Sequence, residues 1–356
     1  MCAVSGPPSQ RGPRLRELGV RIGRLEAGAG DAITDVPGVR VGHVTVWRDE
    51  PQVARTGVTA IVPGEGLAGA PLRAGGAVLN GAGEMTGLIT ASEWRLIETP
   101  VYLTSTMAVG RIYDGAVSVA IESDPVVADA VVIPVVGECD DSWLSTAAPV
   151  QVQAADAGRA VAAAAPGRVG EGAVGAGTGM VCFGWKGGIG TASRRAGEHV
   201  VGALVLANFG SAPDLRFDGI PVGRELPGPG KAPPPAGSCI AVLATDAPLD
   251  GAQLERLARR AGLGLARTGS VAHHGSGEIF LAFSVAERRP RGESATAPGF
   301  PDGGLGDVFT AAVEATEAAV LNALWAAPDV AGREGRSTPG LPHEPVLELL
   351  RRGGRT

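Results

Sequence analysis

Apolar runs rich in β-branched residues recur along the chain from about residue 33 onward, and turn residues separate them. Runs without polar alternation are typical of strands that are buried on both faces. The pattern therefore predicts a protein built largely from short, buried strands. We expect them at residues 39–46, 57–62, 116–121, 131–136, 201–207, 238–244 and 278–284, with a further short apolar run at 77–79.

Other segments have the composition and spacing of helices. Residues 152–165 are rich in alanine, and the Pro-Gly pair that follows them stops a helix. Residues 248–262 place apolar side chains on one face, and residues 306–326 predict a strongly amphipathic helix. A shorter helix is predicted at 345–350. Buried strands together with helices indicate an α/β protein.

The composition bears on how these elements pack. Of the 356 residues 55 are glycine, whereas aromatic residues make up only 4%. Small residues permit close packing between layers, so we expect a compact, multilayered protein. A single domain is predicted at residues 21–327, with a loose N-terminal extension at 1–20 and a C-terminal tail at 328–356. Residues 211–237, rich in Pro and Gly, have the composition of a linker.

Charge and hydropathy exclude several classes of partner. The net charge of −6 argues against a general attraction to nucleic acid or to an anionic membrane. No apolar run approaches the roughly 20 residues that span a bilayer, and the N-terminus lacks the apolar core of a signal peptide. These features predict a cytoplasmic protein that binds neither nucleic acid nor membrane.

The spacing of cysteine and histidine gives no sign of a metal or redox centre. No two of the four cysteines lie at CxxC spacing. The adjacent His273 and His274 have no carboxylate or histidine partner at ligand spacing. The glycine-rich segment around Lys186 lacks the spacing of the phosphate-binding motifs. The sequence therefore indicates no metal and no cofactor.

The pair Gly237-Ser238 lies where the Pro- and Gly-rich linker meets a predicted buried strand. A serine hydroxyl at this place can attack the preceding carbonyl and form an ester that water then opens. The new N-terminus would carry a hydroxyl and an α-amine whose ordinary pKa is about 7.7–8.0. That amine can act as a general base for the hydroxyl near neutral pH. Taken alone, a serine after a glycine is also an ordinary start of a strand.

Three more polar residues fit the same chemistry. Ser276 and Glu278 stand two residues apart at the start of a predicted strand, so their side chains share a face. Such a pair could hold the amine and the hydroxyl of a nucleophile. Asn208 follows another buried strand, and its amide can donate to an oxyanion. Singly, a polar turn and a turn-capping asparagine explain these residues equally well.

Together these residues resemble the DmpA and β-peptidyl aminopeptidase family. The resemblance extends to the runs at 33–43 (ITDVPGVRVGH), 79–87 (LNGAGEMTG) and 186–191 (KGGIGT), and it covers about residues 30–325. It implies a four-layer αββα sandwich, similar to that of the N-terminal-nucleophile hydrolases but with different strand connectivity.

The same resemblance implies that the chain cleaves itself into an α chain, residues 1–237, and a β chain, residues 238–356. The two would stay associated, usually as a homotetramer. Ser238 is then expected to be the nucleophile and Asn208 the oxyanion donor.

The family pattern assigns further roles by position. Ser276 and Glu278 would orient Ser238 and its amine, and Glu138 would bind the free amino group of the substrate. Lys186 matches a lysine that lies by the active site in the related nylon-oligomer hydrolases. One departure concerns Asp140, which stands where the family commonly has an aromatic residue that helps to bind substrate or the oxyanion. An ionised carboxylate cannot donate to an oxyanion.

The sequence thus predicts a self-processing serine aminopeptidase or amidase that releases N-terminal residues from peptides, amides or esters. A nylon-oligomer-type endo-amidase is an alternative, although those relatives cleave before Thr and have two Asp at the places of Ser276 and Glu278. An acyltransferase resembling the self-cleaving ornithine acetyltransferases, which use an internal Thr, is another. An uncleaved, non-catalytic protein is the third.

Overall fold

The computed structural model describes residues 10–231, 237–293 and 299–355, and two β-sheets form its centre. The smaller sheet contains, in spatial order, β1 (Arg40–Arg48), β2 (Ala54–Val62), β5 (Val101–Ser105) and β6 (Val135–Cys139). The larger sheet contains β4 (Leu96–Ile97), β3 (Leu72–Gly81), β12 (Gly277–Arg288), β11 (Ser238–Thr245), β10 (His199–Asn208) and β9 (Gly188–Ala196). Neighbouring strands are antiparallel except β5 with β6 and β11 with β12, which are parallel.

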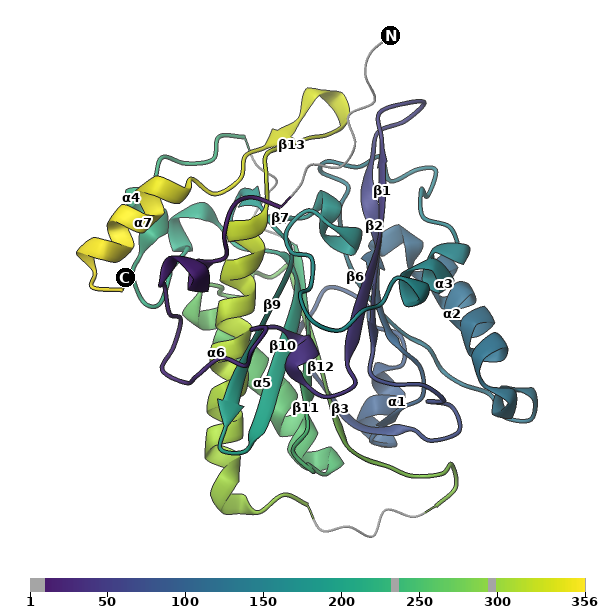
Figure 1. Cartoon of the computed structure of the whole chain (residues 1–356). Coiled ribbons are helices and arrows are strands. Elements are labelled where there is room, and N and C mark those ends of the chain that lie inside the picture. Colours follow the sequence, from purple (N-terminus) through teal and green to yellow (C-terminus); the bar gives the residue numbers. More distant parts are fainter. Residues whose placement is uncertain (1–9, 232–236, 294–298, 356) are drawn as a thin grey trace.

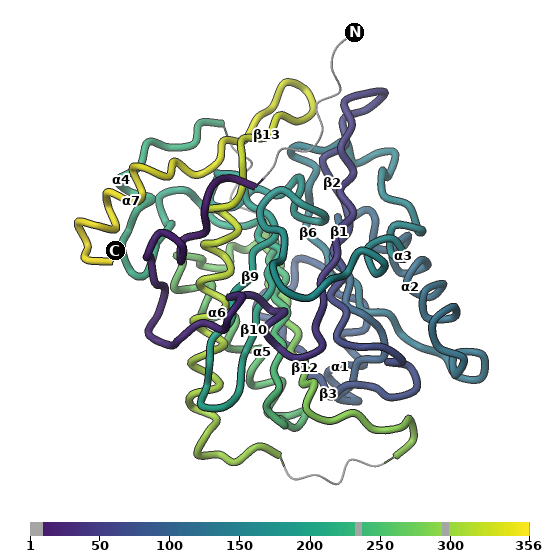
Figure 2. The backbone as a smooth tube through the Cα atoms, in the orientation of Figure 1, coloured from purple at the N-terminus to yellow at the C-terminus, as the bar shows by residue number. Residues whose placement is uncertain are grey.

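Helices cover the outer faces of both sheets, as Figures 1 and 2 show. On the smaller sheet lie α2 (Val109–Ser123) and α3 (Ala155–Ala162), and on the larger sheet lie α5 (Gly251–Arg267) and α6 (Asp302–Ala326). The short α1 (Leu88–Glu93) lies beside β3. The layers therefore follow the order αββα, which confirms the predicted fold class.

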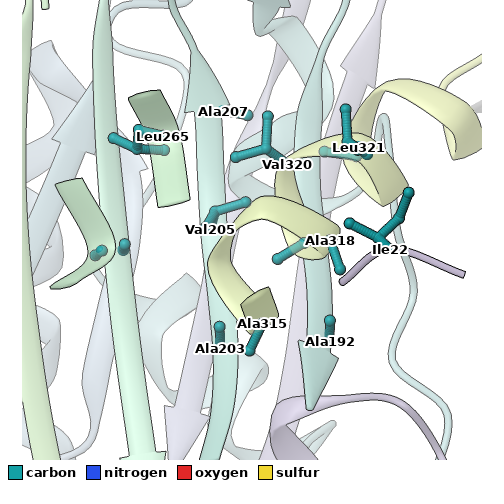
Figure 3. Close-up of a cluster of buried hydrophobic side chains, with 14 of the residues drawn as sticks. Ile22, Ala192, Ala203, Val205, Ala207, Leu265, Ala315, Ala318, Val320 and Leu321 are labelled. Atoms are coloured by element: carbon teal, nitrogen blue, oxygen red, sulfur yellow. The ribbon is translucent and has the colours of Figure 1, made fainter. Parts of the chain in front are cut away.

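Strand alternation assigns each side chain to one of the layers. In β10, Leu204 and Leu206 contribute to the core between the two sheets, whereas Ala203 and Val205 face α5 and α6. Figure 3 shows the second of these cores, in which small side chains on the sheet meet those of α6. A Cβ atom on Gly190 of β9 would collide with the backbone of α6, so glycine lets the helix approach the sheet closely.

Helix α6 differs from its prediction, because it is not amphipathic. Every residue from Glu314 to Ala326 is buried. The sheet and α5 cover one side of the helix, and the N-terminal segment covers much of the rest. The backbone N–H of Leu25 donates to Glu314, and the indole of Trp325 donates to the carbonyl of Pro13. A helix enclosed in this way needs no polar face.

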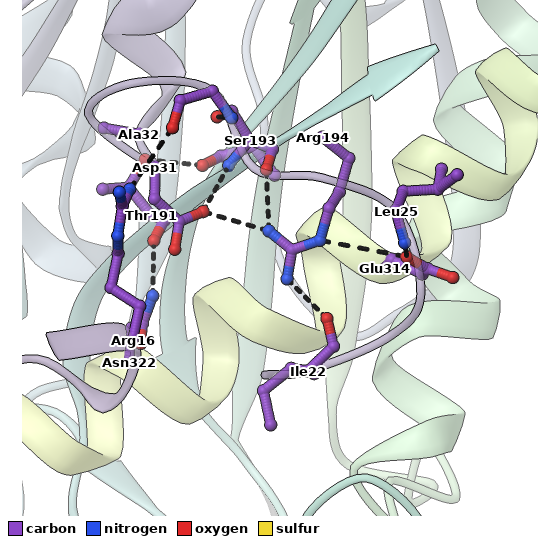
Figure 4. A network of polar contacts seen from close by, with 12 residues as sticks. Arg16, Ile22, Leu25, Asp31, Ala32, Thr191, Ser193, Arg194, Glu314 and Asn322 are labelled. Carbon is purple, nitrogen blue, oxygen red and sulfur yellow. Dashed lines mark hydrogen bonds and ion pairs between the residues drawn. The ribbon is translucent and has the colours of Figure 1, made fainter. Parts of the chain in front are cut away.

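The N-terminal segment is packed rather than loose from residue 10 onward, so that expectation was wrong for residues 10–20; residues 1–9 lie outside the described part. Leu15 is buried, and the Arg14 side chain forms a buried ion pair with Glu171. Figure 4 shows a second anchor further along, in which Arg194 bonds Asp31 and the carbonyl of Ile22.

Two predicted strands were also placed wrongly. Residues 116–121 belong to helix α2, whose buried residues Ile112, Ala116 and Ala120 recur at the helical spacing of four. Their β-branched neighbours lie on the outer side, where Ile121 is exposed. In the other case strand β6 begins only at Val135, because the preceding apolar residues lie outside the sheet and Val131 is 83% exposed.

Described segments before and after the Gly237-Ser238 pair pack into the core. The linker segment contains a short helix, α4 (Val222–Glu225), and buries Leu215 and Phe217 in the core beneath α6; residues 232–236 lie outside the described part. After α6 come the strand pair β13 (Val330–Ala331) and β14 (Ser337–Thr338) and helix α7 (His343–Arg352), whose apolar face packs into the same core. Among the described helices, none combines the length and apolar character needed to cross a bilayer.

Candidate active site

Ser238 opens β11, which lies at the middle of the larger sheet. It pairs with Asn208 at the end of β10 on one side and with Gly277 at the start of β12 on the other. Alternation along β11 places its side chain on the face of Ile240, toward the smaller sheet. The residue is 5% exposed, and within the described residues its hydroxyl has no hydrogen-bond partner.

The residue before it, Gly237, is held tightly by the same two strands. Its carbonyl oxygen accepts a hydrogen bond of 2.9 Å from the backbone N–H of Gly277. A Cβ atom on Gly237 would collide with the carbonyl oxygen of Asn208, so only glycine fits. The carbonyl that Ser238 would attack is therefore fixed and polarised.

A cavity of about 770 Å³ opens above Ser238. It brings together five of the predicted site residues, namely Gly237, Ser238, Asn208, Glu138 and Asp140. The volume falls in the usual range of small-molecule sites, about 300–1,000 Å³. Its other lining residues include Gly83, Glu84, Thr106, Met107, Ser142, Trp143, Phe209 and Arg336.

The side chain of Asn208 is oriented by two hydrogen bonds. Its Oδ1 accepts from the backbone N–H of Val181 at 2.8 Å, which identifies the other terminal atom as the amide nitrogen. That nitrogen donates one proton to the carbonyl of Asp140 at 2.9 Å. An amide nitrogen has two protons, so one remains for a group in the cavity.

Lys186 does not line the cavity, contrary to the expectation that it contributes to substrate binding. It is fully buried, and its ammonium donates to the carbonyls of Gly177, Met180 and Gly187 at 2.7–2.9 Å. Burial lowers the pKa of Lys186 to about 7, opposed by the nearby Asp141. Three carbonyl acceptors match the three donors of an ammonium group and leave none for a substrate.

Glu138 lies at the buried end of the cavity. One carboxylate oxygen accepts from the backbone N–H of Glu84 at 2.9 Å, and the other accepts from the hydroxyl of Thr106. Burial raises the pKa of Glu138, and both hydrogen bonds oppose that shift. A carboxylate in this position gains from a cationic partner that replaces lost water.

Asp140 lines the cavity but is turned toward its own loop. Its carboxylate accepts from both the backbone N–H and the hydroxyl of Ser142, at 2.8 and 2.9 Å. Trp143, three residues further on, supplies an aromatic side chain to the cavity wall. The aromatic residue missing at position 140 therefore has a counterpart nearby in space.

Ser276 and Glu278 are together, as predicted, but neither lines the cavity. The hydroxyl of Ser276 donates to one carboxylate oxygen of Glu278, and both residues are buried. Alternation along β12 places Glu278 on the face of Phe280, opposite to that of Ser238. Burial raises the pKa of Glu278, and its second carboxylate oxygen has no hydrogen-bond partner within the described residues.

Sequence reasoning missed several residues of the cavity. Thr106 follows β5, Trp143 follows β6, and Arg336 comes from the segment after α6 that was set aside as a tail. The parallel pairing of β5 with β6 explains Thr106, because the carboxyl ends of parallel neighbours meet at one edge. No local pattern marks Arg336, which reaches the site only through the tertiary fold.

An αββα sandwich with a serine that opens a central strand beneath a cavity is the arrangement of the N-terminal-nucleophile type of hydrolase. Comparison with known families agrees with this class: the model of peptidase family S58 matches residues 31–338. The chain therefore belongs to peptidase family S58, the DmpA family, and it is a peptide-bond hydrolase of the aminopeptidase and amidase type, as the sequence predicts.

Similar proteins are found over nearly the full length of the chain. It is 39% identical to the β-peptidyl aminopeptidase BapA of Sphingosinicella microcystinivorans, covering 98% of this chain and 94% of that protein. Among solved structures, a β-aminopeptidase of a Burkholderia species is 43% identical with a TM-score of 0.88, covering 96% of this chain and 99% of that one. The L-aminopeptidase D-Ala-esterase/amidase of Ochrobactrum anthropi is 37% identical with a TM-score of 0.90, covering 97% and 99% respectively.

Proposed function

We propose that the chain cleaves itself between Gly237 and Ser238 and then works as an aminopeptidase with Ser238 as its N-terminal nucleophile. The observation that carries the proposal is the fixed Gly237 carbonyl, which Gly277 polarises, directly before a serine that lines a cavity and whose hydroxyl has no hydrogen-bond partner among the described residues.

Self-cleavage would proceed through an ester. The Ser238 hydroxyl oxygen attacks the Gly237 carbonyl carbon, and the backbone C–N bond breaks as the nitrogen takes up a proton. Water then hydrolyses the ester, which leaves a carboxylate on Gly237 and a free amine and hydroxyl on Ser238. The products are chains of residues 1–237 and 238–356.

Turnover would use the same hydroxyl. The free α-amine accepts the hydroxyl proton while the oxygen attacks the substrate carbonyl, and the proton then passes to the leaving amine. The remaining Asn208 amide proton stabilises the oxyanion. Water hydrolyses the acyl-enzyme and regenerates Ser238.

Two carboxylates, those of Glu138 and Glu278, would each bind one of the amino groups at the site. Glu138 would bind the ammonium group of the substrate at the buried end of the cavity. Ser276 and Glu278 flank Gly277, the residue of β12 that pairs with Ser238, and would contact the amine that cleavage creates. The unpartnered oxygen of Glu278 supports this assignment, because a buried carboxylate oxygen without a partner is costly and an ammonium group would satisfy it.

The names of the relatives favour release of N-terminal residues, and β-amino acids are among the candidates, because two of the three proteins above are called β-aminopeptidases. We further propose that the two chains stay associated in a homotetramer and that the enzyme works in the cytoplasm, on small peptides, aminoacyl amides or esters.

Replacement of the nucleophile tests this function. Ser238→Ala should abolish both self-cleavage and peptidase activity, whereas Ser238→Cys should still process because a thiol can form the corresponding thioester. Ser118→Ala, on the exposed side of α2, is the control and should behave as wild type. Peptidase activity retained by purified Ser238→Ala would refute the assignment.

A further inference from the structure

The charges around the cavity are arranged unevenly. Three of its lining residues are acidic, namely Glu84, Glu138 and Asp140. Arg336 is the single cationic side chain among the described residues that line it. An aminopeptidase substrate has its ammonium group at one end, which the acidic residues can bind, so the cation requires a separate explanation.

Arg336 is held in place at the more open part of the cavity. Its guanidinium lies over the ring of Trp143, 4.7 Å from the centroid, and donates to the carbonyl of the same residue at 3.3 Å. The Arg336 side chain keeps 24% of its surface exposed, whereas Glu138 is 2% exposed. A substrate bound to both residues would place its amine at Glu138 and its leaving portion at Arg336.

The guanidinium retains the capacity to bind an anion. Its partner Glu334 is joined by one contact of 2.7 Å, and the Glu334 side chain is 60% exposed. Exposed ion pairs of this kind are weak because water and salt screen them, so a second carboxylate can compete with Glu334 or bind beside it. A guanidinium has five donors in a fixed fork that matches a carboxylate, and contacts with the described residues use two of them.

We propose that Arg336 forms a carboxylate subsite that binds the C-terminal carboxylate of short peptides, so that the enzyme prefers dipeptides and similar substrates over the corresponding amides. This inference rests on the proposed aminopeptidase function. Glu138 would then bind the ammonium group of a zwitterionic peptide and Arg336 its C-terminal carboxylate, with Ser238 between them. The cavity volume of about 770 Å³ suits a substrate of that size.

The test compares a dipeptide acid with its amide, for example leucyl-alanine with leucyl-alaninamide, or the β-alanyl pair if the wild type cleaves that series faster. Arg336→Gln should lower kcat/KM for the dipeptide acid by about tenfold. This loss lies between that expected for removing an exposed ion pair and that expected for removing a buried hydrogen bond to a charged group. The kcat/KM of Arg336→Gln for the amide should stay unchanged, which also shows that the variant is folded. Added salt should weaken the acid preference of the wild type.

Arg333→Gln is the matched control. Arg333 lies in the same turn and contacts the same Glu334, at 3.5 Å, but it does not line the cavity. This variant should keep the preference of the wild type. If the ratio of kcat/KM for the acid to kcat/KM for the amide is the same in wild type and Arg336→Gln, the subsite is overturned while the aminopeptidase function stays intact. A wild type that cleaves neither substrate in either series would overturn the proposed function and the subsite with it.

Discussion

One of the two hydrogen bonds that orient Asn208 comes from a peptide group that a buried cation polarises from the other side. The carbonyl of Met180 accepts from the Lys186 ammonium at 2.7 Å, and the N–H of the same peptide unit, which belongs to Val181, donates to Asn208 Oδ1 at 2.8 Å. Hydrogen bonds in such a chain polarise one another. Lys186 would therefore act on the oxyanion through Asn208 without touching the substrate.

Asn208→Ala should lower kcat by about 10²–10³, the usual cost of an oxyanion donor. Lys186→Gln, which removes the charge but retains donors, should lower kcat by less, and it should add nothing in the Asn208→Ala background because both act on one proton. Thr178→Val, which removes a buried hydroxyl bonded to Gly175 in the same segment, is the control for local damage. If the double variant instead shows the product of the two single reductions in kcat, Lys186 has a purely structural role.

Asp140 adds a negative charge to the cavity where relatives commonly have an aromatic residue. A negative charge near the Ser238 amine raises the pKa of that amine, and the amine must be neutral to act as a base. Asp140→Tyr should therefore shift the acidic limb of the kcat/KM profile to lower pH and reduce any preference for basic over neutral aminoacyl substrates. Kinetics across a pH series measure both effects. Unchanged profiles and selectivity would mean that the Ser142 bonds hold the carboxylate out of range.

At the scale of elements, α6 is enclosed by other segments from Glu314 onward, so even the charged side chains of that part are buried. It buries two carboxylates, Glu314 and Glu317, and each meets an arginine from a neighbouring segment: Glu314 lies 3.9 Å from Arg194, and Glu317 lies 2.7 Å from Arg267. Figure 4 shows Glu314 bonded to the N-terminal segment. Burial raises the pKa of Glu317 to about 7, opposed by Arg267.

Glu317→Gln should flatten the pH dependence of stability. Between the ordinary pKa of 4.5 and the folded value of about 7, the folded state holds a proton that the unfolded state has lost. The unfolding free energy of the wild type must then fall as pH rises through this window. The Tm difference between wild type and Glu317→Gln should therefore move in favour of the variant from pH 5 to pH 7. Other buried carboxylates titrate in both proteins and cancel, so parallel curves would contradict the assignment.

At the scale of the whole molecule, the proposed cleavage separates two chains that share one sheet. Strand β11 would become the N-terminus of the smaller chain, yet it pairs with β10 from the larger chain along its full length. On its other side β12 pairs with β3, again from the larger chain. The core beneath α6 likewise contains residues from both chains. Cleavage would therefore leave these contacts between the two chains in place.

Purified protein should run on a denaturing gel as two chains of 237 and 119 residues, the second number being 356 − 237. N-terminal sequencing of the smaller chain should begin Ser-Cys-Ile-Ala. The two should elute together in native size-exclusion chromatography, because neither has a complete sheet alone. An active protein that stays a single full-length chain after days at neutral pH would refute self-processing.

The sequence by itself determined the fold class, the family and the strands β1, β2, β10, β11 and β12, because buried strands and family motifs are encoded in local runs of residues. It also identified Ser238, Asn208, Glu138 and Asp140, which the structure gathers around one cavity. Only the tertiary structure decided the state of the helices: residues 116–121 became helical because their buried positions recur at a spacing of four, and α6 lost its polar face because other segments enclose it.

The tertiary structure likewise decided which polar residues face the cavity. Lys186 stands in a motif that resembles active-site sequence, yet its ammonium group donates all its hydrogen bonds to three backbone carbonyls. Arg336 stands in a segment without any motif, yet the chain after α6 returns to the cavity and places it there. The position of Lys186 depends on hydrogen bonds to backbone atoms, and that of Arg336 depends on its contact with Trp143, which is 193 positions away in the sequence. Neither kind of contact leaves a pattern in the local sequence.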